Sequence, residues 1–158
     1  MADIPLIRQL AGVAFPATYK SIITAEQIDY MMDMMYSTTS LTRQMTEEHH
    51  TYLLLYTPEN EAAGYVSIQP IADDEYELQK IYVLPRFQGQ HLGRELFEAA
   101  VAHVKELHPA PCRLFLHVNR HNKARAFYEH LGMHVASQGD YEIGHGYYMN
   151  DYIMEKTV

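Results

Sequence analysis

The sequence predicts an α+β protein in which helices cover both faces of a mixed β-sheet. Strand-like stretches separated by turn residues occupy residues 52–84, and a nearly continuous apolar run occupies residues 113–118. An amphipathic helical pattern lies between them, and a second helix and a hairpin follow. This order of strands, helix, strand, helix and hairpin indicates an α+β fold in a single domain spanning residues 1–158.

The composition is that of an ordinary globular domain. A chain of 158 residues with 47% apolar residues can bury a sizeable core. Charged residues at 20% and aromatic residues at 11% exclude a disordered tail. The single cysteine, Cys112, excludes a framework of disulfide bonds within the chain and is expected to be a small apolar residue.

The charge and the apolar runs limit the partners. A net charge of −8 argues against nucleic acid, which requires a basic face, and is compatible with a cationic substrate. Asp3 and Arg8 interrupt any signal-peptide pattern, and no stretch reaches the roughly 20 apolar residues that span a bilayer. We therefore expect a cytoplasmic protein without a membrane partner, and the sequence leaves open whether it forms a homodimer.

The first third of the chain predicts one strand and two helices. Residues 4–10 alternate weakly and are expected to form a first strand. Thr24, followed by Glu26, has the chemistry of a helix N-cap. The apolar residues of that helix are Ile28, Met31, Met32 and Met35. A second, short helix is expected over residues 38–48.

The middle of the chain predicts an antiparallel meander. Strands are expected at residues 52–56 and 63–69, joined by polar turn residues. Asp73 and Asp74 mark a second turn, so the whole of residues 52–84 is expected to fold back and forth.

The last third predicts the remaining elements. Pro109 stops the long helix, and the apolar run at residues 113–118 is typical of a buried central strand. A helix over residues 122–131 should end at Gly132, and two last strands should flank residues 144–146.

The loop at residues 85–94 is the first functional signal. It follows a strand-like stretch and opens the long helix, whose first N–H groups have no partners within the helix and can bind a phosphate. Gly89 lets the backbone turn and approach a ligand, and Gly93 allows close contact in the first helical turn. An ordinary strand-to-helix connection explains an isolated Gly-x-x-x-Gly equally well, and the loop is neither a Walker nor a Rossmann motif.

The second half of the chain adds a resemblance. Residues 88–93 read Gln-Gly-Gln-His-Leu-Gly, and residues 122–128 read Asn-Lys-Ala-Arg-Ala-Phe-Tyr. The sequence resembles the GNAT superfamily of acyl-CoA-dependent N-acyltransferases, whose phosphate loop reads Gln/Arg-x-x-Gly-x-Gly/Ala and is followed by Asn-x-x-Ala-x-x-x-Tyr. The resemblance covers residues 53–154, and residues 148–154 look like the end of the PaiA-like polyamine acetyltransferases.

Two positions depart from the family pattern. His91 stands where the family usually has glycine; its amide can still donate, although its Cβ narrows the allowed backbone angles. Asn122 lies one residue closer to Ala124 than the family spacing requires, so Asn119 could share its role.

The resemblance implies a GNAT fold that binds acetyl-CoA as co-substrate. In that fold a parallel pair of strands, here ending at Leu84 and starting at Arg113, splays apart and holds the cofactor in the gap. The residues implied for cofactor binding are Ile81, Tyr82, Val83, Gln88, Gly89, Gln90, His91, Leu92, Gly93, Arg94, Asn119 and Asn122.

The chemistry of amine acetylation needs three groups. An alkyl amine has a pKa of about 10 and must lose a proton before it attacks a thioester. The resemblance implies that the amide of Val83 stabilises the oxyanion, that Tyr128 is the acid and that Glu77 is the base. Without the motif, Tyr128 would be taken as a core tyrosine, and Glu77 is equally well explained as a solvated strand carboxylate.

Other titratable residues give weaker signals. The ten histidines show no helical spacing for metal ligands and the one cysteine has no partner, so we expect no metal site. His117, on the predicted central strand, is more often a satisfied core histidine than a base.

The sequence therefore predicts an acyltransferase of the N-acetyltransferase class that acts on a primary amine. A polyamine or another small cationic amine is the leading acceptor, because the chain resembles the PaiA-like enzymes, has a net charge of −8 and gathers acidic residues in segments that border the acceptor side of the implied fold. These residues are Glu26, Asp29, Asp33, Glu47, Glu48, Asp73, Asp74 and Glu75. A solvated acidic face explains the three acids of the early helix equally well. The alternatives are a protein or peptide N-acetyltransferase and a non-catalytic acyl-CoA-binding domain.

Overall fold

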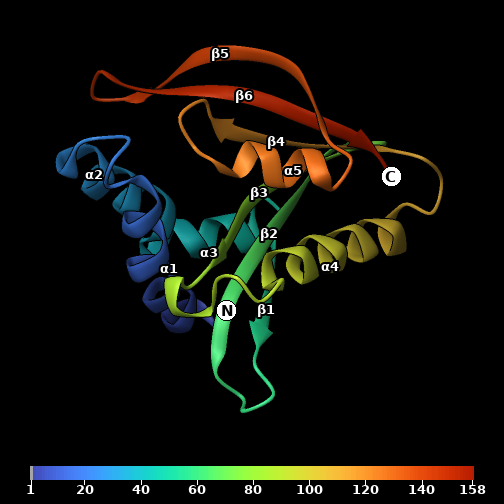
Figure 1. Ribbon diagram of the computed structural model, residues 1–158, viewed down its shortest axis with the longest axis horizontal. Coiled ribbons are helices and arrows are strands. Elements are labelled where there is room, and N and C mark those ends of the chain that lie inside the picture. Colours follow the sequence, from blue (N-terminus) through green and yellow to red (C-terminus); the bar gives the residue numbers. More distant parts are fainter. Residues whose placement is uncertain (1) are drawn as a thin grey trace.

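A computed structural model describes residues 2–158 as a six-stranded sheet with helices on both faces (Figure 1). The order of strands in the sheet is β1-β2-β3-β4-β6-β5, and only the pair β3–β4 is parallel. The strands are β1 (Thr51–Tyr56), β2 (Ala62–Ala72), β3 (Glu75–Val83), β4 (Arg113–Asn119), β5 (His134–Gly144) and β6 (Tyr147–Thr157). The helices are α1 (Ile4–Tyr19), α2 (Ala25–Tyr36), α3 (Thr38–Thr46), the 3-10 turn η1 (Pro85–Phe87), α4 (Leu92–Leu107) and α5 (Ala124–His130).

Two apolar cores lie on opposite faces of the sheet. Helices α4 and α5 pack on one face around residues such as Leu96, Leu114 and Met154. Helices α1, α2 and α3 pack on the other face around Phe15 and Tyr65. The predicted meander, the buried strand β4 and the closing hairpin are confirmed, and no helix among residues 2–158 is long and apolar enough to cross a membrane.

The expected strand at residues 4–10 is wrong, because this segment begins α1. Its buried residues follow a helical spacing that continues beyond the predicted segment: Ile4, Ile7, Leu10, Ala11, Ala14 and Phe15. Pro5 lies in the first turn, where a missing N–H costs no hydrogen bond. Helix α5 also begins at Ala124 rather than at residue 122.

The parallel pair β3–β4 is joined over three residues only. Residues 75–77 of β3 pair with residues 113–115 of β4, and beyond them no pairing joins the two strands. At the joined end the guanidinium of Arg113 contacts Glu75 at 2.9 Å and Glu155 at 2.7 Å. Since both carboxylates and the guanidinium lie on neighbouring strands, they hold this end of the pair closed while the other end opens.

Candidate active site

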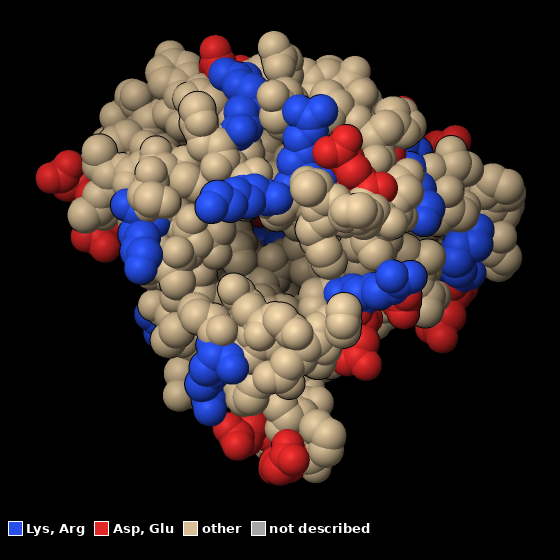
Figure 2. Space-filling model, viewed as in Figure 1, with Lys and Arg blue, Asp and Glu red and all other residues tan. Residues whose placement is uncertain are grey.

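Two pockets meet at the open end of the β3–β4 pair. The first, called here the gap pocket, has a volume of about 650 Å³ and lies between β3, β4 and the end of α1. The second, called here the loop pocket, also has a volume of about 650 Å³ and lies between the residue 87–94 loop and α5. Figure 2 shows a hollow near the middle of this face of the molecule, bordered by several Lys and Arg side chains. The residues that line both pockets are Ile81, Tyr82, Val83, Gln88, Ala124 and Tyr128.

The loop pocket collects most of the residues predicted to bind a phosphate. Gly89, His91 and Gly93 all line it, whereas Gln90 is exposed and does not. Gly89 has φ 84°, and a Cβ built there would meet nothing within 4 Å, so its lack of a side chain matters for backbone conformation and not for space. A Cβ on Gly93 would lie 3.2 Å from the ring of Phe127, so this glycine lets α4 approach α5 closely.

His91 takes a left-handed backbone conformation with φ 61°. The left-handed region disfavours a Cβ, so this backbone conformation suits the glycine of the resembled family better than a histidine. The residue precedes the first turn of α4 and its carbonyl accepts from the Glu95 N–H. The turn that presents the helix N-terminus to the loop pocket is therefore formed without a glycine at its centre.

The loop is tied to the strand that it follows. The side-chain amide of Gln88 donates to the Val83 carbonyl oxygen at 3.1 Å. The Leu84 N–H donates to the Ala63 carbonyl on β2 at 2.8 Å. These bonds set the direction in which the chain leaves β3 and enters the loop pocket.

The two asparagines predicted to bind the cofactor shape the turn after β4. Asn122 lines the gap pocket, and its Oδ1 accepts from the Ala124 N–H at 2.9 Å at the start of α5. Asn119 is 3% exposed and lies in the wall of neither pocket, and its Oδ1 accepts from the His121 N–H at 2.9 Å. Of the two, Asn122 is the one that a ligand in the gap pocket could touch.

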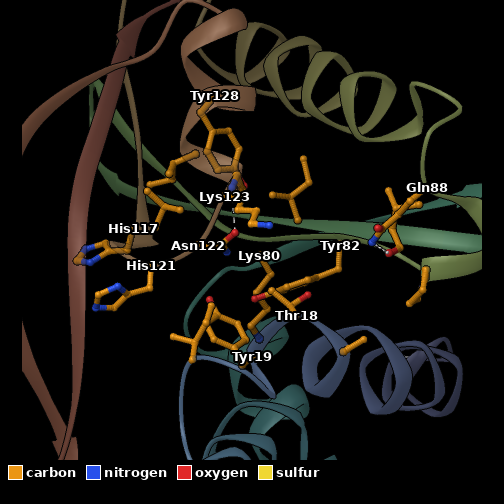
Figure 3. A pocket seen from close by; sticks show the side chains of 18 of the residues that line it. Thr18, Tyr19, Lys80, Tyr82, Gln88, His117, His121, Asn122, Lys123 and Tyr128 are labelled. Atoms are coloured by element: carbon orange, nitrogen blue, oxygen red, sulfur yellow. Dashed lines mark hydrogen bonds between the residues drawn. The ribbon is translucent and has the colours of Figure 1, made fainter.

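Tyr128 stands where the two pockets meet. It comes from α5, is 7% exposed and lines both pockets. Burial raises the pKa of its phenol far above the ordinary value of 10, so the hydroxyl keeps its proton at neutral pH. It is therefore a proton donor held at the junction (Figure 3).

The candidate base Glu77 is half-buried on β3 and does not line the gap pocket, whereas His117 on β4 does. The Nδ1 atom of His117 lies 3.4 Å from Oδ2 of the buried Asp151 on β6. The hydrogen bond to Asp151, with the charge of Glu77 adding to it, raises the pKa of His117 against the opposing effect of burial. Burial raises the pKa of Glu77 in turn. The three groups form one acid–base cluster whose pocket-facing member is His117.

Lys80 is a wall residue of the gap pocket that sequence reasoning missed. It is 6% exposed, and its Nζ donates to Oε1 of Gln44 at 2.9 Å and to the Tyr52 hydroxyl at 2.5 Å. The same Nζ lies 4.5 Å from the centre of the Tyr36 ring. Burial lowers the pKa of Lys80 from its ordinary value of 10.5 to about 7.

A β-bulge places Lys80 there. Ser67 pairs with Lys80 and Ile68 pairs with Leu78, so Gln79 is an extra residue on β3. Because of this insertion, Leu78 packs in the core beside α4 while Lys80 faces α3 on the opposite side of the sheet. Alternation without a bulge would have placed both side chains on one face. The sequence offers only the run of apolar residues that follows the lysine as a signal of its burial.

The acidic residues that motivated a cationic acceptor lie outside the gap pocket. Glu26, Asp29 and Asp33 are exposed on α2, and no Asp or Glu is among the described residues that line the pocket. The acids at residues 47–48 and 73–75 are likewise absent from its wall.

The comparisons with known proteins agree with this fold. Residues 12–133 match the model of the acetyltransferase (GNAT) family. An uncharacterized N-acetyltransferase of Mycobacterium bovis is 24% identical over the whole chain and 99% of its own length.

Two solved structures show the same fold. The PaiA N-acetyltransferase of Thermoplasma acidophilum, in complex with coenzyme A, has a TM-score of 0.80 at 23% identity over 99% of this chain and 94% of its own. The ribosomal-protein-S18-alanine N-acetyltransferase of Escherichia coli has a TM-score of 0.72 at 22% identity over 100% of this chain and 89% of its own. With the family model covering most of its length, the chain belongs to the GNAT family of N-acetyltransferases.

Proposed function

We propose that the protein transfers the acetyl group of acetyl-CoA to a primary amine by direct attack of the amine on the thioester. The observation that carries this proposal is the position of Tyr128, a buried and protonated phenol at the junction of the loop pocket and the gap pocket. One pocket has the features of a phosphate site and the other has room for an acceptor, so the reacting atoms would meet beside this hydroxyl.

The loop pocket fits the phosphates of acetyl-CoA. The first turn of α4 lines it with Leu92 and Gly93, where N–H groups are without helical partners. The exposed Arg94, whose Nε contacts Glu98 at 2.9 Å, adds a guanidinium that can bind phosphate. Ile81 and Val83 on β3 line both pockets, and the exposed backbone of such a strand can pair with the pantetheine arm. Acetyl-CoA supplies, when bound, a thioester carbonyl that a neutral amine can attack.

Three groups of this chain would then carry the proton and charge transfers. The Val83 N–H donates to the carbonyl oxygen as it becomes negative, and Tyr128 gives its proton to the leaving sulfur. A carbon–nitrogen bond forms, the carbon–sulfur bond breaks, and the proton lost by the amine passes to the acid–base cluster.

His117 is the member of that cluster best placed to accept the amine's proton. A buried carboxylate needs a partner for its charge, so Asp151 holds the Nδ1 proton of His117 and leaves Nε2 as the acceptor. Glu77 lies behind His117 and tunes its pKa, and it is the second candidate base.

Acetyl transfer to amines tests the proposal directly. Free thiol release from acetyl-CoA should depend on both the protein and a primary amine, and mass spectrometry should find the acetylated amine. Calorimetry should show acetyl-CoA binding without any amine. Binding without transfer to any amine would instead support a non-catalytic acyl-CoA-binding domain, and acetylation of peptides alone would favour the protein acceptor.

A further inference from the structure

The wall of the gap pocket reverses the charge balance of the chain. The chain has 20 acidic residues against 12 Lys and Arg. Among the described residues that line this pocket there is no Asp or Glu, yet there are five basic side chains from four segments. These are Lys20, Lys80, His117, His121 and Lys123. A cationic acceptor would enter a wall that carries its own sign of charge.

Lys80 is the strongest of these observations because it is buried. Its Nζ donates to a neutral amide oxygen and a neutral hydroxyl, from Gln44 and Tyr52. Among residues 2–158 no carboxylate lies within ion-pair distance of this ammonium, and no described group accepts its third N–H. A buried ammonium without a counter-ion is unfavourable, so an anion that arrives with a ligand would stabilise the protonated form of Lys80.

Two exposed lysines also line the same pocket. Lys20 follows the last residue of α1, and Lys123 precedes the first residue of α5. Figure 3 shows Lys123 and Lys80 among the side chains that line the gap pocket. None of the three lysines lines the loop pocket, so they are separate from the residues that would hold the phosphates of acetyl-CoA.

From this arrangement we infer that the acceptor amine carries an anionic group, a carboxylate or a phosphate, that binds Lys80 together with Lys20 and Lys123. The inference rests on the proposed acetyl transfer and names the class of acceptor. The amine of such a molecule would lie at Tyr128 and His117 while its anionic group reaches the lysines. A polyamine has no group that these lysines could bind.

A matched set of acceptors tests the inference. We suggest 5-aminopentanoate, pentylamine and cadaverine, which share one carbon chain and end in an anion, a methyl group and a cation, with shorter homologues of each. Aminoalkyl phosphates form a further arm that separates a phosphate from a carboxylate. At the best chain length, kcat/KM for the anionic amine should exceed that for the neutral amine by about tenfold, the effect of one modest charge pair, and the diamine should be the poorest.

Variants locate the effect. Lys80→Met keeps the length of the side chain. In this variant the ratio of kcat/KM for the anionic acceptor to kcat/KM for the neutral acceptor should be close to one, and KM for acetyl-CoA should be unchanged. Lys20→Met and Lys123→Met alter exposed residues and should each reduce this kcat/KM ratio in part. These two variants test the inference even if Lys80→Met folds poorly. Lys105→Met on α4, outside both pockets, is the control and should leave the ratio unchanged.

The outcomes separate the two proposals. Equal rates across the series, or the highest rate with a diamine, would overturn the anionic acceptor and leave acetyl transfer intact. Mass spectrometry that found the acetyl group on Lys80 would also overturn it, because the lysine would then be a nucleophile. No transfer to any amine would overturn both.

Discussion

The imidazole of His117 on β4 and the carboxylate of Asp151 on β6 are 3.4 Å apart, and only the first lines the gap pocket. Asp151 is 5% exposed, and no described group donates to its second oxygen, Oδ1. The pair therefore has the form of a base oriented by a buried carboxylate, at the open end of the parallel strands.

This relationship predicts a pH effect. Because Asp151 raises the pKa of His117 above its ordinary value of 6.5, neutral His117 becomes available only as the pH rises through that raised pKa. In Asp151→Asn, the rise of kcat/KM with pH on the acid side of the profile should occur at lower pH. The maximal kcat/KM should also fall, because the carboxylate no longer holds His117 in the tautomer with a free Nε2. The exposed Asp140, changed to Asn, is the control, and superimposable profiles for Asp151→Asn and the wild type would exclude His117 as the base.

Tyr128 should act on the chemical step. Tyr128→Phe should lower kcat by roughly 10- to 10⁴-fold, the usual contribution of a positioned acid, and leave KM for acetyl-CoA nearly unchanged. Burial raises the pKa of Tyr128, so no alkaline loss of activity below pH 9 should come from this residue. Tyr148→Phe, at a half-exposed position, serves as control. A turnover equal to the wild type would return Tyr128 to a packing role.

Gly89 should control acetyl-CoA affinity through charge. Asp and Asn have nearly the same shape, and both tolerate the left-handed conformation that φ 84° demands. Gly89→Asp should therefore weaken acetyl-CoA binding by calorimetry much more than Gly89→Asn, since only Asp repels phosphate oxygens. Equal losses would mean that backbone strain, and not the phosphate, explains the effect.

Lys80 should couple stability to pH. Its pKa is about 7 in the fold against 10.5 ordinarily, a difference worth on the order of 5 kcal/mol. Below pH 7 both folded and unfolded chains carry the proton, and the folded state bears the full cost of burying it. Between pH 7 and 10.5 the unfolded chain binds more protons, so stability rises with pH.

The comparison with Lys80→Met isolates this effect. The variant should have a higher Tm than the wild type at pH 6.5, and the difference should shrink as the pH approaches 9.5. The groups that face Lys80 are Gln44, Tyr36 and Tyr52, with the charges of Glu48 and His50 nearby. The control, Lys105→Met, should differ in Tm from the wild type by the same amount at every pH in this range. If the Tm difference between Lys80→Met and the wild type were also independent of pH, Lys80 would have an ordinary pKa in the fold.

The sequence by itself determined the elements from β1 to β6 and the loop at residues 85–94. Local patterns explain this success, because alternation, turn residues and helix stops act over a few neighbours. The same local reasoning failed at residues 4–10, because seven residues are too few to show the helical spacing of buried residues that continues to Phe15. The motif that singled out Tyr128 is also local, and the structure places this residue in the lining of both pockets.

Only the tertiary structure decided which side chains surround the gap pocket. The bulge at Gln79 turns Lys80 to the face of α3, and the pairing of β4 with β6 brings Asp151 to His117 from more than thirty residues away. Neither relationship leaves a local pattern, because each depends on which strands become neighbours and in which register. The net charge of −8 belongs to the whole chain, whereas the charge at a site depends on which side chains face it, and those lining the gap pocket include lysines and histidines but no Asp or Glu.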